Sequence, residues 1–234
     1  TLYAAGGNAG GLRRRKRGLD TVFVDRAFKE RLVGRLTWFM GAEDWHTSRG
    51  IPWKLGIVLY GPPGTGKTSL IHALASDLGL DIKYIKSLHG IGAAFMSGRK
   101  TDLFVIEDID TIAAGLNRDG PRDGQGDEAA RSSALHEILN SMDGMQTPDG
   151  LKFIVTTNHL DRLDAAIVRP GRIDEVIEIG PLSLQSAREM FKAFYGRDGI
   201  TAYVPTTGAT LQQMFSTLSA DAAEAELASR AAAG

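Results

Sequence analysis

Five short segments that are rich in apolar residues have the length of buried β-strands. They lie at residues 57–60, 82–85, 103–106, 153–156 and 176–179. The run at residues 57–60 is continuous and ends at glycine and proline, which is typical of a strand covered on both faces of a parallel sheet. The pattern therefore predicts a sheet whose strands are buried.

Segments with helical spacing separate these runs. In the first of them, residues 24–41, the side chains of Phe28, Leu32, Leu36 and Phe39 recur at intervals of four and three, which places them on one helix face. The same spacing occurs at residues 69–78 and 129–142. It is the only pattern after Pro181, and the chain ends in an alanine-rich stretch of high helix propensity.

Alternating strands and helices predict an α/β fold, in which a parallel sheet is sandwiched by helices joined through right-handed crossovers. The predicted organisation is a linker at residues 1–18, an α/β core at 19–180 and a small helical lid at 181–234. The polar, glycine-rich segment 117–127 is expected to form a loop. Catalytic loops of such a sheet lie at the carboxyl ends of its strands.

Composition narrows the possible functions. The net charge of −1 does not favour nucleic acid as a partner, and the absence of cysteine excludes disulfides and thiolate metal sites. No apolar run reaches the roughly 18 residues that cross a bilayer. The chain starts without methionine, and we expect it to be part of a longer protein in which any membrane anchor precedes residue 1. The basic run Arg13–Arg17 is read as a solvated linker, or as a strip that meets an acidic partner or lipid headgroups.

The strongest motif is GPPGTGKT, which lies between a predicted strand and a predicted helix. It matches the P-loop pattern, whose backbone N–H groups surround phosphates at a helix N-terminus. Lys67 is expected to reach the β- and γ-phosphates, and the Thr68 hydroxyl to bind Mg²⁺. The predicted nucleotide-binding residues are Gly61, Pro62, Pro63, Gly64, Thr65, Gly66, Lys67, Thr68 and Ser69. The motif predicts ATP and Mg²⁺ as ligands.

A second motif, LFVIEDID, is an apolar strand that ends in the carboxylates Glu107, Asp108 and Asp110. In P-loop enzymes an acid at this point holds the metal and its neighbour orients the attacking water. We assign Glu107 to the metal and Asp108 to the water. The reverse assignment stays open, because the usual order is Asp followed by Glu.

Polar residues follow the next two strands. Asn158, at the tip of FIVTTN, is expected to sense the γ-phosphate or the adjacent water. Arg169 and Arg172 flank a proline–glycine turn, and an arginine presented to a neighbour's γ-phosphate can accelerate hydrolysis 10³- to 10⁵-fold. If these arginines act in this way, the site is shared between subunits and the active form is a ring.

The order and spacing of these motifs resemble those of an AAA ATPase from about Arg17 to Tyr195. The segments that narrow the resemblance are LDTVFVD, WHTSRGIPW, GIVLYGPPGTGKTSLIHALA, SALHEILNSMDG and TTNHLDRLDAAIVRPGRID. Together with the Glu–Asp order at positions 107 and 108, they resemble the mitochondrial Rieske-protein translocase family, AAA chaperones that complete the respiratory cytochrome bc complex.

This resemblance implies a ring-forming ATPase that acts on a protein substrate, with an N-terminal membrane helix in the mitochondrial inner membrane and the ATPase domain in the matrix. It implies a heptamer, with a hexamer as the alternative. Carried over by position, it implies nucleotide binding at Gly61–Thr68, acids at Glu107 and Asp108, a sensor at Asn158, and arginine fingers at Arg169 and Arg172. The chain departs from the family pattern at residues 87–102, which are shorter, and after Val204.

The sequence leaves alternatives to this function. A nucleotide-gated scaffold with little turnover is the first alternative, and a general protein-remodelling AAA ATPase outside mitochondria is the second. A protease is disfavoured because His136–Glu137 lacks the second histidine of a zinc motif, Asn140 standing in its place. A nucleic-acid motor lacks interleaved basic and aromatic residues. A threading loop could come only from Leu88–Met96, for which ordinary packing is the preferred interpretation.

Overall fold

The computed structural model describes residues 17–87, 90–110, 137–143 and 147–233. The predicted loop 117–127, the first part of the predicted helix 129–142 and most of the predicted linker 1–18 lie outside the described residues, as does His136. Of the basic run, the described residue is Arg17.

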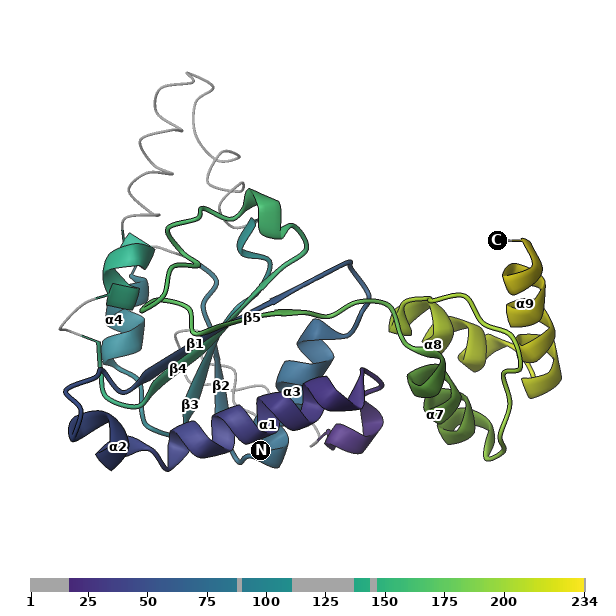
Figure 1. The fold of residues 1–234 in the computed structure, drawn as a ribbon, viewed down its shortest axis with the longest axis horizontal. Coiled ribbons are helices and arrows are strands. Elements are labelled where there is room, and N and C mark those ends of the chain that lie inside the picture. The colour runs from purple at the N-terminus through teal and green to yellow at the C-terminus, as the bar shows by residue number, and fades with distance from the viewer. Residues whose placement is uncertain (1–16, 88–89, 111–136, 144–146, 234) are drawn as a thin grey trace, which may run out of the picture.

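All five predicted strands form, and together they make a parallel sheet (Figure 1). They are β1 (Lys54–Tyr60), β2 (Asp81–Tyr84), β3 (Asp102–Ile106), β4 (Leu151–Thr157) and β5 (Glu175–Glu178). Their order is β2-β3-β4-β1-β5, so that β4 and β1 are central. The loops that follow β3, β4 and β1 are therefore neighbours at one edge, where such sheets bind ligands.

Helices cover both faces of the sheet, as predicted. The helix α1 (Arg26–Met40) packs on one face together with α3 (Lys67–Asp77), against a set of buried side chains that includes Leu55, Ile57 and Leu59 of β1. The other face, which carries Val58, is covered by α4 (Ile91–Met96) and by the helical residues 137–143. The period-two alternation along β1 divides the core into these two layers.

Two short helices were not predicted. One is α2 (Glu43–Thr47). The other is α4, which lies within the threading-loop candidate Leu88–Met96. Phe95 of α4 is 1% exposed, and its ring centroid lies 5.0 Å from that of Phe104 and 5.6 Å from that of Phe153. This aromatic side chain therefore packs in the core, as the preferred interpretation expected.

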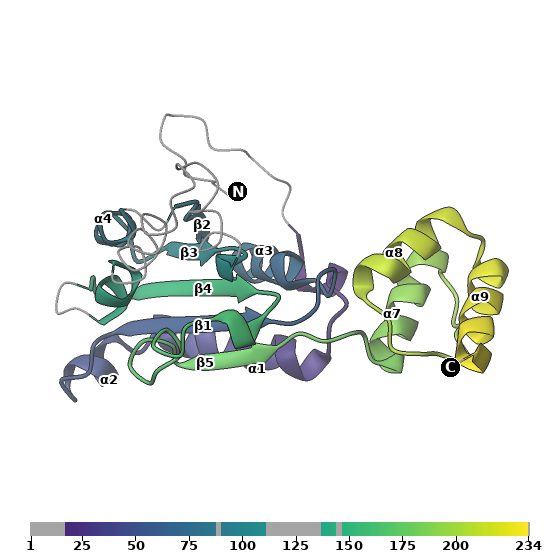
Figure 2. The same ribbon diagram turned by 90° about the horizontal axis from the view of Figure 1, so that it is seen from above.

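The described residues after 181 form three helices around a core of their own: α7 (Leu184–Tyr195), α8 (Gly208–Thr217) and α9 (Ala220–Ala233). Side-chain oxygens of Ser183 and Thr207 cap the first two at their N-termini. In Figure 2 the strands point toward this lid, so the ligand-binding edge of the sheet faces it. Two 3₁₀ turns complete the described elements, η1 (Leu19–Thr21) and η2 (Leu160–Arg162). Among the described residues no helix combines the length and apolarity needed to cross a bilayer.

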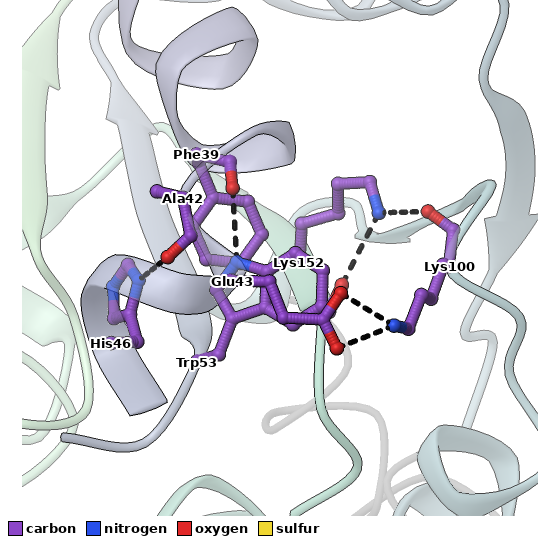
Figure 3. Close-up of polar contacts among 8 residues, drawn as sticks. Phe39, Ala42, Glu43, His46, Trp53, Lys100 and Lys152 are labelled. Atoms are coloured by element: carbon purple, nitrogen blue, oxygen red, sulfur yellow. Dashed lines mark hydrogen bonds and ion pairs between the residues drawn. The ribbon is translucent and has the colours of Figure 1, made fainter. Parts of the chain in front are cut away.

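A buried lysine lies at the opposite edge of the sheet, near the start of β4 (Figure 3). Lys152 is 2% exposed, and its amine donates hydrogen bonds to Lys100 O at 2.5 Å and Gly150 O at 3.2 Å. The Lys100 side chain points away to pair with Glu43 of α2 at 2.7 Å. Burial lowers the pKa of Lys152 to about 8, although the negative charge of Asp102 raises this pKa and so offsets part of the effect.

This lysine makes stability depend on pH. Between its folded pKa of about 8 and its ordinary value of 10.5, the unfolded chain holds a proton that the folded chain has released. The free energy of unfolding therefore rises with pH across this window, by up to about 1.4 kcal/mol per pH unit. We expect Lys152→Met to lose this rise, measured by urea unfolding at pH 7.5, 8.5 and 9.5. The exposed Lys192→Met is the control, and parallel pH profiles of wild type and Lys152→Met would contradict the expectation.

Candidate active site

The loop between β1 and α3 requires glycine at specific positions. Gly61 and Gly64 have φ of +140° and +78°, a region that favours glycine. A Cβ on Gly61 would lie 2.3 Å from Ile179 O, and one on Gly64 would lie 3.0 Å from Ala209 Cβ of the lid. The loop therefore follows a path that side chains at these positions would block, and it leads directly into the N-terminus of α3, where phosphates bind favourably.

Lys67 begins α3 and folds back over this loop. Its amine donates hydrogen bonds to Gly61 O at 2.7 Å, to Pro62 O at 3.0 Å and to Asn158 Oδ1 at 2.8 Å. Burial lowers the pKa of this amine, while Asp108 and Asp110 act in the opposite direction. The contact with Asn158 brings the predicted sensor, 91 residues away along the chain, to the predicted phosphate-binding lysine.

Thr68 and Glu107 are also brought together. The Thr68 hydroxyl donates a hydrogen bond to Glu107 Oε1 at 2.6 Å, linking the first turn of α3 to the end of β3. A hydroxyl and a carboxylate oxygen are ligands that Mg²⁺ prefers. The pair thus fits a magnesium ion, and Thr68 and Glu107 are the two residues that the sequence predicts as its ligands.

Asp108 faces a different partner from its neighbour Glu107, because the chain turns at this residue. Its φ of +47° is uncommon for a residue other than glycine and is typical of residues held at functional sites. Its backbone N–H donates to Thr156 Oγ1 at 3.0 Å, and Asn158 Nδ2 donates to its Oδ1 at 3.5 Å. Asp110 accepts a bond from Thr157 Oγ1 at 2.9 Å. One acid therefore lies by Thr68 and the next by Asn158.

The two predicted finger arginines have different surroundings. Arg172 Nε donates to Asp143 Oδ2 at 2.6 Å and its Nη1 donates to Ala166 O at 2.6 Å; the bond from Arg172 lowers the pKa of Asp143. Arg169 is exposed, and within the described part of the chain no side-chain hydrogen bond or ion pair involves it. Neither arginine lines the cleft of its own chain. Arg172 is thus held internally, whereas Arg169 is open to another molecule.

A cleft of about 430 Å³ extends from the P-loop to the lid, within the range of small-ligand sites. The cleft is lined by three groups of residues: the N-terminal group Arg17, Thr21, Val22 and Phe23, the core group 63–69 with Asp108, Thr156 and Asn158, and the lid group Met190, Phe194, Gly208, Ala209 and Gln212. Ala209 N donates to Gly64 O at 3.0 Å, which joins the lid to the P-loop. Of the core group, residues 63–69, Asp108 and Asn158 are among the site residues predicted from the sequence, whereas Thr156 and the N-terminal and lid groups are not.

The N-terminal and lid groups carry a weak sequence signal. Val22 and Phe23 belong to LDTVFVD, which marked the family resemblance but gave no indication of which residue meets a ligand. Met190 and Phe194 read only as the apolar stripe of a helix. These residues reach one cleft only because of how the lid packs on the core. The hydrophobic periodicity of the sequence does not indicate that packing.

Known proteins resemble this chain in sequence. The sequence model of the ATPase family associated with various cellular activities (AAA) matches residues 57–181. The chain is 36% identical over 195 residues to the mitochondrial chaperone BCS1 of Homo sapiens, covering 79% of this chain and 45% of that protein. It is 34% identical over 217 residues to a probable mitochondrial chaperone BCS1-B of Dictyostelium discoideum, covering 79% and 46%. An AAA-ATPase of Arabidopsis thaliana is 35% identical over 189 residues, covering 77% and 38%.

The chain thus spans about half the length of the curated relatives that it matches. The predicted α/β P-loop fold and the predicted family resemblance are both confirmed. The family model covers more than half of the chain and includes the P-loop, the acidic strand end, Asn158 and both arginines. On this basis the chain belongs to the AAA family of ATPases.

Proposed function

We propose that this chain is the ATP-hydrolysing domain of a ring-forming AAA protein that uses hydrolysis to translocate a protein or to assemble a protein complex. One observation carries the proposal: Lys67, the Thr68–Glu107 pair and the Asn158–Asp108 pair meet at one edge of the sheet, beside a cleft of suitable size. Five polar side chains from three separate loops would not converge in this way for packing alone.

Each side chain has a distinct task in the proposed reaction. The Lys67 amine neutralises charge on the β- and γ-phosphates, and the inward-turned P-loop amides hold the phosphate chain. Asp108 orients the attacking water and accepts its proton, while Asn158, in contact with both Lys67 and Asp108, reports whether the γ-phosphate is present. Thr68 and Glu107 would hold Mg²⁺, which when bound neutralises phosphate charge.

The apolar residues that line the cleft could bind the adenine base of ATP. Val22 is buried, and Phe23, Met190 and Phe194 supply apolar surface on which a planar ring can pack. Because Met190 and Phe194 belong to the lid, base binding would hold the lid against the core. Nucleotide occupancy would then control the lid position.

The arginines support a shared site. Arg169 is exposed and lies outside the cleft of its own chain, so its role is to complete the site of an adjoining protomer. Arg172, held by Asp143, positions the turn that presents Arg169 and would reach the neighbour only after this pair opens. The proposed assembly is a homo-oligomeric ring, a heptamer by family resemblance or a hexamer, and native mass spectrometry in ATP distinguishes the two.

The finer proposal follows the resemblance to the mitochondrial chaperones. In it the complete protein is anchored in the mitochondrial inner membrane by a segment preceding residue 1, the ATPase domain lies in the matrix, and the substrate is the Rieske iron–sulfur protein. Support comes from relatives whose names place them in mitochondria. The test is whether the complete protein fractionates with inner-membrane vesicles and whether its depletion leaves the Rieske protein outside its complex.

Nucleotide binding is tested by Lys67→Ala. Hydrogen bonds from charged groups contribute about 1.5–3 kcal/mol, so we expect ATP affinity to fall roughly 10- to 100-fold. Titration calorimetry with Mg²⁺ and ATP measures this, with Lys192→Ala, an exposed lysine paired with Asp198, as the control. A wild-type domain without affinity for ATP, or a Lys67→Ala variant with unchanged affinity, would overturn the proposed site.

A further inference from the structure

Arg17, the last residue of the basic run, has a defined position at the nucleotide cleft. It lines the cleft, and its Nη1 donates to Ser69 Oγ at 2.9 Å. Its Nε and Nη2 donate to Thr21 Oγ1 and Thr21 O, each at 3.3 Å. Arg17 is thus bound both to the first turn of α3 and to Thr21 of the N-terminal group.

The Arg17 guanidinium is bonded to the positive end of a helix. Ser69 lies in the first turn of α3, at the positive end of the helix dipole, and Lys67 begins the same turn. No carboxylate of the described residues forms an ion pair with Arg17. Arg17, Lys67 and a helix N-terminus therefore line one cleft together with the single acid Asp108, an arrangement that suits a multiply charged anion.

We propose that Arg17 binds the α-phosphate of the nucleotide and so couples the chain that leads into the domain to nucleotide occupancy. This rests on the proposed function of the cleft. Lys67 and Thr68 are assigned to the β- and γ-phosphates and to the metal, whereas Arg17 lies between Ser69 and the apolar residues that suit the base. The α-phosphate is the anionic group between the base and the terminal phosphates. A guanidinium can bind it with two parallel N–H groups.

The coupling has a direct consequence. Arg17 is separated only by Gly18 from η1 and lies next to the segment 1–16, through which any preceding region of the protein connects. Binding of ADP or ATP would add a contact that holds Arg17 more firmly in the cleft, and release of nucleotide would leave it with its bonds to Ser69 and Thr21 alone. Position 17 would thereby respond to nucleotide binding and release, and not to hydrolysis of the γ-phosphate.

Affinity measurements on three variants test the phosphate contact. We expect Arg17→Ala and Arg17→Gln to bind ADP and ATP about 10-fold more weakly, with equal losses for both because both carry the α-phosphate. Arg17→Lys keeps the positive charge but lacks the two parallel N–H donors of the guanidinium, so it should recover part of the lost affinity. Arg26→Ala, at an exposed arginine paired with Glu30 on α1, is the matched control and should bind normally.

Trypsin provides a second readout that does not depend on turnover. Because coupling is reciprocal, a 10-fold contribution to affinity should slow cleavage of the Arg17–Gly18 bond about 10-fold at saturating ADP. Mass spectrometry of the fragment that begins at Gly18 measures this rate. The Lys67→Ala variant serves as a control. At an ADP concentration that does not saturate this variant, ADP should not protect its Arg17–Gly18 bond from trypsin.

The outcomes separate this proposal from the proposed function. Normal ADP affinity of both Arg17→Ala and Arg17→Gln, with ADP-independent cleavage, would overturn the role of Arg17 while the nucleotide site stands. Normal affinity of Arg17→Gln alone would show that Arg17 only ties the chain to Ser69, which also overturns the proposal. Failure of the wild-type protein to bind ADP would instead remove the proposed function itself.

Discussion

Replacing Arg169 with alanine is expected to lower ATP hydrolysis about 10³-fold while ATP affinity stays within about two-fold of wild type. The arginine is exposed, does not line the cleft of its own chain, and sits on the turn before Gly171. Its charge would act on the transition state of a neighbouring site, where charge develops on the transferred phosphoryl group. Binding in its own cleft would not involve it.

Mixing two inactive variants tests whether the site is shared. In a ring that contains Arg169→Ala and Asp108→Asn protomers, some sites combine an intact Asp108 of the first with an intact Arg169 of the second. We expect the mixture to regain a substantial fraction of wild-type turnover, although each variant alone is inactive. Arg230→Ala, on the exposed side of α9, is the control. A mixture as inactive as its components, or an Arg169→Ala protein that loses ATP affinity, would refute the finger role.

Asp108→Asn is expected to reduce the rate of hydrolysis by roughly 10²- to 10⁴-fold, the range for losing a positioned acid–base group. Asparagine keeps the size of the side chain but cannot accept the proton of the attacking water. ATP affinity should not fall, because Lys67 and the Thr68–Glu107 pair are unchanged. A slightly higher affinity is expected, since one negative charge near the phosphates is removed.

A neighbouring acid provides the matched control for this variant. Asp110 lies at the same strand end, but its carboxylate is bonded to Thr157, so Asp110→Asn should lose less than about 10-fold in rate. Single-turnover hydrolysis of radiolabelled ATP separates the chemical step from product release. Equal, near-zero rates of wild type and Asp108→Asn would favour the scaffold that binds ATP without turnover. A larger loss in Glu107→Gln than in Asp108→Asn, with ATP affinity intact, would favour the reverse assignment of the two acids.

Local patterns in the sequence were sufficient for the strands, the main helices and the P-loop. Apolar-rich runs identify β1, β3 and β4 because strands buried on both faces carry few polar positions, whereas β2 and β5 are recognised by their shorter apolar pairs. The stripe of Leu32, Leu36 and Phe39 identifies α1 because helical spacing aligns these residues on one side. Glu107 and Asp108 have separate hydrogen-bond partners, Thr68 and Asn158, since neighbouring side chains at a strand end diverge.

Other features depended on contacts between distant parts of the chain. Helix α4 has too few residues for periodicity to reveal, and its burial is decided by Phe95 packing on Phe104 and Phe153. Within the described residues, the Arg172 side chain is held in place and that of Arg169 is not, because Asp143, 29 residues before Arg172 in the sequence, accepts a hydrogen bond from Arg172. The sequence presents both arginines alike, because nothing local marks which one will be paired.

The sequence by itself determined that this chain has a P-loop, an acidic strand end and a polar strand tip, since each is a short motif with its own backbone requirement. Only the tertiary structure decided how they combine. The strand order places β4 between β3 and β1, so Asn158 reaches Lys67, and the lid brings Met190 and Phe194 into the same cleft as Val22. Arg17 meets Ser69 across 52 residues for the same reason. Local periodicity reports the face that a segment buries, whereas the partner on that face is selected by the packing of the whole chain.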